Sequence, residues 1–178
     1  FESRKLIENL VDYLIRKCTD ENGLLTDKIN VLNNEKSKNH NLYELGDYAQ
    51  YIAFAGLLLD RKDYLHYSVN QSLILSRKFQ TREGIIDIKP GKMLLHIATM
   101  DLYIGLVQTY LITQEKSLKK IIDNFYSWLF KMLPNKNISV PSLIIRRFNF
   151  PLPFSNPMDN GNHIELLCEM YEHTKERK

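Results

Sequence analysis

Cysteine is scarce in this chain: its 178 residues include only Cys18 and Cys168, which lie far apart in the sequence. Neither cysteine has a neighbour at the spacing of a zinc ligand set, and two isolated thiols provide no disulfide framework. Such cysteines are typically half-buried free thiols. They favour a reducing environment, so we expect a cytoplasmic protein.

Long hydrophobic runs and charge of a single sign are missing as well. The longest apolar run, 51–59, is too short to cross a bilayer, so no membrane span is expected. The 24 Lys and Arg residues are interspersed with 21 Asp and Glu, and the net charge of +3 forms no basic stripe that could follow a phosphate backbone. We therefore expect no nucleic-acid partner. With 44% hydrophobic residues, the chain is expected to fold as one domain over residues 1–178.

Proline is also scarce, and its positions divide the chain. Proline breaks the interior of a helix, because it lacks the N–H donor and its ring clashes with the preceding turn. The six prolines all lie outside the segments with helical periodicity: Pro90, Pro134, Pro141, Pro151, Pro153 and Pro157. Long uninterrupted segments therefore remain for helices.

What is present is a threefold alternation of two kinds of helix. In each repeat an amphipathic helix is followed by a long loop and then by a helix that is apolar on nearly every face. The expected pairs are 2–18 with 43–59, 62–78 with 93–112, and 116–133 with a segment that starts near residue 159. A helix that is apolar all round needs cover on all sides, so the sequence predicts an all-α fold in which amphipathic outer helices surround buried inner ones.

The connections between these helices are of two lengths. Only a few residues separate each inner helix from the next outer one, so neighbouring helices should be antiparallel and the long loops should meet at one end. The first two long loops share a Gly, two aliphatic residues and a nearby Asp, at 21–27 and 82–87, which indicates an internal repeat. In the third long loop we expect a short strand within 140–147 and irregular, Pro-rich chain at 148–154.

Two inner helices open with short polar motifs, Glu44-Leu-Gly-Asp-Tyr48 and Met158-Asp-Asn-Gly-Asn-His-Ile-Glu165. With the alternation of outer and inner helices, they resemble the helical hairpins of the (α/α) toroids, the six-hairpin glycosidase-like folds. Only half the hairpins of a closed toroid are present. The resemblance therefore implies helical hairpins arranged as an incomplete (α/α) toroid or an open α–α array. It also implies that the chain is part of a larger chain or assembly, completed by self-association or by a missing half-ring.

The resemblance further implies a carbohydrate-active site where the long loops meet the starts of the inner helices. A glycan hydrolase uses two carboxylates, one as general acid and one as base. Asp47 and Asp159 are the first candidate pair for catalysis, because both lie near the start of an inner helix. The alternative role for Asp47 is a structural cap, since an Asp at a helix start accepts hydrogen bonds from free backbone N–H groups.

Asp101 is a third catalytic candidate, because it lies inside an otherwise apolar inner helix. A carboxylate in such a place needs a partner or a shifted pKa. Tyr48 and Tyr103 are both candidate partners. A structural hydrogen bond is the alternative to a catalytic role.

Further polar and aromatic residues of the same rim are candidate sugar-binding residues. They are His96, Arg146, Arg147, Phe148, Asn160, His163 and Glu165. Aromatic rings can stack on sugar faces, although the aromatic residues at 148–154 could instead cover the end of the ring or a partner surface. Asp159 and His163 have the spacing of metal ligands on a helix, but the sequence fixes no third ligand, so neither a metal nor a cofactor is expected.

Two classes of function follow from this pattern. The first is a carbohydrate-active domain, a hydrolase, lyase or epimerase with an oligosaccharide ligand. The alternative is a non-catalytic helical-repeat module that binds another protein. Analogy of fold favours the first class, whereas the lack of an evident acid–base pair and the half-ring length favour the second.

Overall fold

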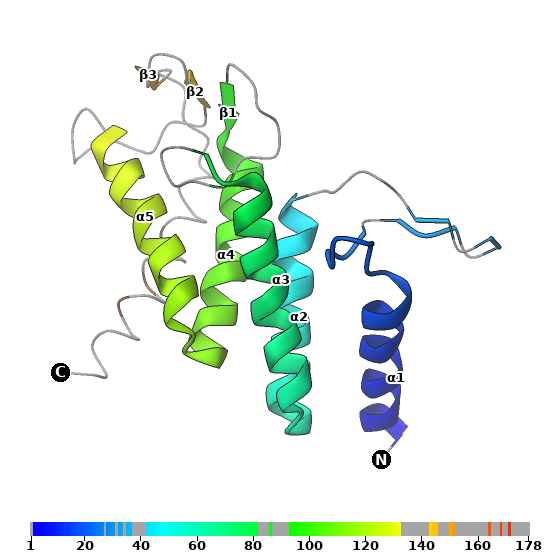
Figure 1. Ribbon diagram of the computed structural model, residues 1–178. Helices are drawn as coiled ribbons and strands as arrows, with labels where there is room; N and C mark the ends of the chain where they lie inside the picture. Colours follow the sequence, from blue (N-terminus) through cyan, green and yellow to red (C-terminus); the bar gives the residue numbers. More distant parts are fainter. Residues whose placement is uncertain are drawn as a thin grey trace.

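The computed structural model confirms an all-α fold of helical hairpins (Figure 1). It describes residues 2–26, 28–30, 32–33, 35–36, 42–81, 86, 93–132, 143–145, 150–151, 164, 168 and 171. The helices are α1 (Glu2–Lys17), α2 (Leu42–Leu59), α3 (Lys62–Phe79), α4 (His96–Thr113) and α5 (Lys116–Met132), and residues 164, 168 and 171 are helical as well. In the part of the chain that is described, no helix is long and apolar enough to cross a membrane.

The one clear error among the helix predictions concerns the start of the second inner helix. Met93–Leu95 forms strand β1, which pairs antiparallel with β2 (Leu143–Ile145) and, through β2, with β3 (Phe150–Pro151). The apolar run that begins at residue 93 forms a strand because another apolar strand, β2, pairs with it. Pairing with a distant part of the chain overrides helix propensity here.

The third long loop was predicted half correctly. The strand expected within 140–147 is confirmed as β2, but the irregular chain expected at 148–154 includes strand β3. Pro151 is tolerated there because β3 is last in the strand order β1-β2-β3, where a missing N–H donor breaks no further pairing. The small sheet lies beyond the first turn of α4, at the end of the bundle where α5 finishes (Figure 1).

The helices alternate in direction, as the short links predict. Helices α1, α3 and α5 run towards the end that carries the sheet, and α2 and α4 run away from it (Figure 1). Both short links begin with a residue of positive φ, Asp60 (55°) after α2 and Gln114 (58°) after α4. A left-handed residue directly after a helix is a common way to end it. The two hairpin turns are thus built alike, as expected of a repeat.

The two similar loop motifs match at the one position that the structure describes in both of them. Residue 25 forms an isolated antiparallel bridge with Thr19, and residue 86 forms one with Gln80. The aliphatic side chains at these positions, Leu25 and Ile86, are both buried. At this position the two loops agree with the internal repeat predicted from the sequence.

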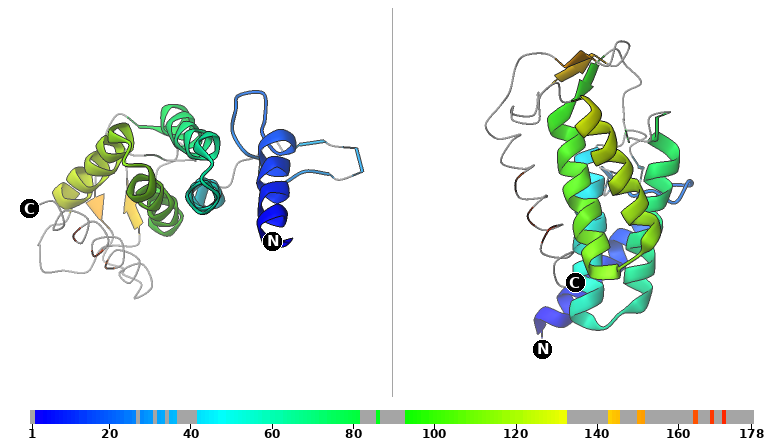
Figure 2. Two further views of the ribbon diagram at one scale, coloured as in Figure 1. Left: turned by 90° about the horizontal axis from the view of Figure 1, so that it is seen from below. Right: turned by 90° about the vertical axis from the view of Figure 1, so that its left-hand side faces the viewer.

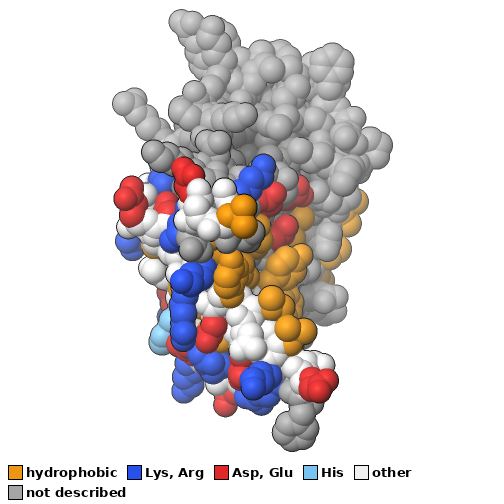
Figure 3. All heavy atoms as spheres, turned by 90° about the vertical axis from the view of Figure 1, so that its right-hand side faces the viewer, with side chains coloured by type: hydrophobic (Ala, Val, Ile, Leu, Met, Phe, Trp, Pro, Cys, Tyr) orange, Lys and Arg blue, Asp and Glu red, His pale blue; other side chains and the backbone are white. Residues whose placement is uncertain are grey.

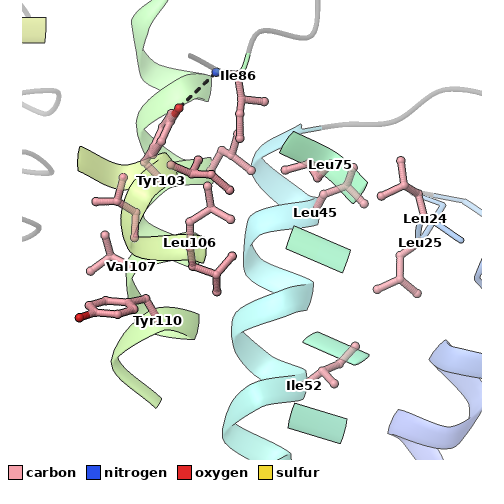
Figure 4. Packing of buried hydrophobic residues seen from close by; sticks show 14 of the residues in the cluster. Leu24, Leu25, Leu45, Ile52, Leu75, Ile86, Tyr103, Leu106, Val107 and Tyr110 are labelled. Carbon is pink, nitrogen blue, oxygen red and sulfur yellow. Dashed lines mark hydrogen bonds between the residues drawn. The ribbon is translucent and has the colours of Figure 1, made fainter. Parts of the chain in front are cut away.

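The core lies between α2, α3, α4 and α5. Figure 4 shows part of it, with residues from α2, α3, α4 and the loops. The ring of Tyr103 stacks on that of Phe125 with centroids 3.8 Å apart, and its hydroxyl oxygen accepts a hydrogen bond of 3.2 Å from the backbone N–H of Ile86. Trp128 is buried. Of the two free cysteines, Cys18 is buried and Cys168 is exposed.

Helix α1 is attached differently, at the side of the α2–α3 hairpin (Figure 2). Val11 is its one buried residue. Polar contacts also hold it. Arg4 donates to the carbonyl oxygen of Leu59 (3.0 Å), and the Tyr64 hydroxyl lies 2.7 Å from the Asp12 carboxylate and 3.4 Å from the carbonyl oxygen of Glu8. The hydroxyls of Thr19, just after α1, and Tyr67 lie 2.5 Å apart. Ile7, Leu14 and Ile15 are partly buried against the core, so α1 is held by one narrow apolar row together with these polar contacts.

Candidate functional site

The two described inner helices carry a carboxylate at the same depth. Asp47 lies five residues after the first residue of α2, and Asp101 lies five residues after the first residue of α4. Both helices begin at the end of the bundle where the long connections lie (Figure 1). Two of the three catalytic candidates are therefore in equivalent positions on neighbouring helices.

A close backbone approach brings these two turns together. A Cβ atom on Gly46 would lie 2.8 Å from the carbonyl oxygen of Leu102, and one on Gly105 would lie 2.3 Å from the backbone of Gly46. Only glycine permits helices to approach so closely. Asp47 directly follows this contact on α2, and Asp101 directly precedes it on α4.

The environment of Asp47 favours its protonated form. The residue is half-buried, and the loss of solvation raises the pKa of its carboxyl above the usual range. The negative charge of Glu44, one helical turn earlier, raises it further. A carboxyl group that keeps its proton to higher pH is better suited to act as a general acid.

The structure also excludes one predicted role of Asp47. Helix α2 begins at Leu42, so Asp47 lies in its second turn rather than at the cap position that was the structural alternative. The earlier start arises because the apolar pattern of the helix extends through Leu42 and Leu45 to the loop.

Asp101 is half-buried and is engaged with neighbouring groups, as a carboxylate in an apolar helix requires. Tyr103, one of its two candidate partners, points its hydroxyl at the backbone of Ile86 (Figure 4). Burial raises the pKa of Tyr103 well above its usual range. This tyrosine therefore stays neutral and acts as a structural link between α4 and the loop before it.

The other candidates divide into one placed residue and a group without described positions. His96 is the first residue of α4, at the same end of the bundle as Asp47. Outside the described residues lie Arg146, Arg147, Phe148, Asp159, Asn160, His163 and Glu165. The pairing of Asp47 with Asp159 therefore stays a prediction. Among the residues with described positions, no group of three His, Cys, Asp or Glu side chains could hold a metal ion.

A cavity of about 480 Å³, which the sequence analysis did not predict, lies near the other end of the helices. It is lined by α3 and by the turn between α4 and α5: Lys62, Leu65, His66, Val69, Asn70, Leu73, Ile112, Thr113 and Glu115. The signal that could have revealed it is the spacing of Lys62, His66 and Asn70, which places three polar side chains on one face of an outer helix. None of the predicted site residues lines this cavity.

Comparison with known proteins supports the fold that was predicted. No family model matches the chain, and no curated protein matches its sequence. Among solved structures, the chain is similar to the cellobiose 2-epimerase of Bacillus thermoamylovorans B4167, an (α/α)6 toroid, with a TM-score of 0.70 and 14% sequence identity. The similarity covers 96% of this chain and 47% of the epimerase. The chain thus has the fold of a partial (α/α) toroid and spans about half the length of that protein.

Proposed function

We propose that this chain is a carbohydrate-active domain of the hydrolase, lyase or epimerase type, with its site at the loop end of the inner helices. The observation that carries the proposal is the pair of carboxylates at equal depth on α2 and α4, next to the Gly46–Leu102 contact. The fold shared with cellobiose 2-epimerase supports the choice of a sugar ligand.

The proposed chemistry is acid–base catalysis. Asp47 holds a proton to higher pH than an exposed carboxyl and acts as the proton donor. Asp159, near the start of the third inner helix, acts as the base. In hydrolysis the donor protonates the leaving oxygen while the base takes a proton from water. In epimerisation one group removes a proton from carbon and the other returns a proton on the opposite face.

The remaining candidates have supporting roles in this proposal. Asp101 orients groups beside Asp47 at the contact between the inner helices. The sugar is bound by residues of the rim: His96, Arg146, Arg147, Phe148, Asn160, His163 and Glu165. The epimerase that the chain resembles is about twice as long, so in this proposal further hairpins would complete the cleft.

The test is a thermal-shift screen of the chain against cellobiose and against amino and uronic oligosaccharides. A ligand that binds only the folded state stabilises it by about 2.7 kcal/mol at a hundredfold excess over its dissociation constant. We expect a saturable rise in melting temperature with one class of sugar. Product formation with that sugar is then followed by proton NMR, and Asp47→Asn should abolish turnover while the variant still folds.

A matched control comes from the cavity between α3 and the α4–α5 turn. His66→Ala alters the lining of the cavity between α3 and the α4–α5 turn and leaves the loop end untouched. It should leave the sugar-induced shift unchanged. If His66→Ala abolished the shift and Asp47→Asn retained it, the sugar would bind in the cavity beside His66, which would contradict this proposal. No shift with any sugar would contradict the proposal altogether.

The non-catalytic interaction module remains the second candidate. The observation that favours it is an apolar surface over α1 and α2, where several large hydrophobic side chains are exposed. A module of this kind would show no sugar-dependent shift and would bind its partner through that surface.

A further inference from the structure

One flank of α2 is apolar and open to solvent. Its side chains are Tyr51, Phe54, Leu57 and Leu58, which are between 44% and 70% exposed. Helix α1 presents a second apolar row beside them, Leu6, Leu10 and Tyr13, spaced by four and three residues. We call these seven residues the open edge.

The open edge is hollowed as well as exposed. A hollow of about 630 Å³ lies between the two helices, lined by Ile7 of α1 and by residues of the apolar flank of α2. Seen from the side on which α1 lies, hydrophobic side chains gather in a band along the molecule, with Lys and Arg beside it (Figure 3). A contiguous apolar surface with a charged margin is typical of a site that another protein element covers.

The position of α2 in the fold indicates what kind of element is missing. Its other flanks are covered by α4 and α3, the two helices with which it packs most extensively. In a closed toroid an inner helix has an inner helix on each side, so the element that fits the open edge is an inner helix with an apolar face. The toroid that this chain matches has about twice its length.

The chain itself carries a face of this kind. Ile164, Cys168 and Tyr171 are helical, and their spacing of four and three residues puts them on one side of a helix. All three are exposed, Ile164 and Tyr171 to 63% each. The sequence predicts that these residues belong to the third inner helix, which follows α5 in chain order and so lies at the other end of the series of hairpins from α2. We call these three residues the closing face.

We propose that two copies of this chain associate into one ring, in which the open edge of each copy packs against the closing face of the other. A twofold axis through the centre of the ring generates two identical junctions. Both the open edge and the closing face of each copy are then covered, so assembly stops at the dimer. The inference goes beyond the proposed function, because it assigns the surfaces that complete the ring whether or not the ring binds a sugar.

The first measurement is the molar mass of the chain by sedimentation equilibrium over a range of concentrations. The chain has a mass of 21.0 kDa, and we expect a reversible dimer. Leu58→Glu places a charge at the most exposed position of the α2 flank and should weaken the dimer at least about 100-fold, because an unpaired charge would be buried at both junctions. The matched control is Leu32→Glu, at a leucine that is 92% exposed in the loop before α2, which should leave the dimer unchanged.

Cys168 tests the other half of the junction. In the proposed dimer its thiol is covered, so alkylation at concentrations where the dimer forms should be at least about tenfold slower than in the Leu58→Glu variant. Circular dichroism should show that this variant keeps the helix content of the parent chain.

Three results would overturn the proposal. One is a chain that stays monomeric at every concentration. Another is a dimer that survives Leu58→Glu, or an assembly that grows beyond two copies. The third is a dimer in which Cys168 reacts as fast as in the variant, because association would then use the open edge without the closing face. None of these measurements contains a sugar, so failure here and failure of the sugar screen are distinct.

Discussion

The two flanks of α2 have similar hydrophobicity and very different surroundings. Towards α4, Gly46 lets the backbones touch, and a Cβ on Gly105 would come within 2.3 Å of α2. Towards α1, large side chains are exposed and a hollow of about 630 Å³ remains. No charged residue occurs from Tyr48 to Leu59. Apolar composition therefore shows that a helix must be buried against other elements. Small residues such as Gly46 show which of its flanks packs against another helix of the same chain.

The largest effect should come from breaking the closed flank with Gly105→Ala. The new methyl group would overlap the backbone of Gly46, which cannot move away like a side chain, so α2 and α4 must separate. We expect a loss of about 3 kcal/mol in the free energy of unfolding, measured by urea denaturation.

Gly56→Ala is the matched control for this prediction. A Cβ on Gly56 would meet mainly the flexible end of Leu65, 2.8 Å away, so a shift of one side chain relieves most of the overlap. The better helix propensity of alanine offsets the remaining cost, and the net change should stay within about 1 kcal/mol. Equal losses in the two variants would show that α2 and α4 are not held by backbone contact.

The comparison of the flanks also marks what the sequence could predict. The helix pattern identified five helices to within a few residues, because apolar periodicity and proline positions are local signals. It missed β1 because the run from Met93 to Leu95 is apolar in either conformation, and only the strand at Leu143–Ile145 decides between them. It also led us to expect cover on every side of α2, which the described chain does not supply.

The sequence predicted at which end of the bundle the candidate site residues lie, but not which of them are neighbours in space. Asp47 and Asp101 were both predicted as candidates, but their equivalent placement depends on the starts of α2 and α4 and on the contact at Gly46. That contact is set by the packing of helices distant in the chain. The cavity beside His66 was missed because its lining comes from an outer helix, where polar residues are expected in any case.

A smaller loss is expected from Tyr103→Phe, which keeps the stacked ring and removes the acceptor for the buried N–H of Ile86. An unsatisfied buried donor costs about 1–3 kcal/mol, which thermal unfolding should detect. Tyr51→Phe on the open flank is the control. The Tyr51 side chain is largely exposed, so the free energy of unfolding of this variant should change by less than about 0.5 kcal/mol. A loss in Tyr51→Phe as large as in Tyr103→Phe would contradict the difference between the flanks.

Smaller again is the effect of loosening α1 with Tyr64→Phe. The variant loses the 2.7 Å hydrogen bond to Asp12, one of the few contacts that hold α1, at a cost of about 1 kcal/mol. Hydrogen exchange should become faster in α1 and stay unchanged in α2 and α4, because the closed flank does not depend on this contact. Tyr13→Phe, at an exposed position of α1, should leave exchange unaffected. Faster exchange throughout the molecule would mean that α1 is part of the same cooperative unit.

The smallest effect, and the only one of opposite sign, is expected from Asp47→Asn. Desolvation, assisted by Glu44, raises the pKa of this carboxyl in the folded state, so the folded chain binds more protons than the unfolded chain just above the ordinary Asp pKa of about 3.9. Stability of the parent chain therefore falls as the pH rises through the raised pKa. Asparagine carries no charge, so the variant should melt slightly higher at neutral pH and no higher below about pH 4. A scan of melting temperature against pH for both proteins measures this difference.

A lower melting temperature of Asp47→Asn at neutral pH would contradict this prediction, because it would show that the ionised carboxylate stabilises the fold. Asp47 would then be a structural residue, and its role as proton donor would lose its main support.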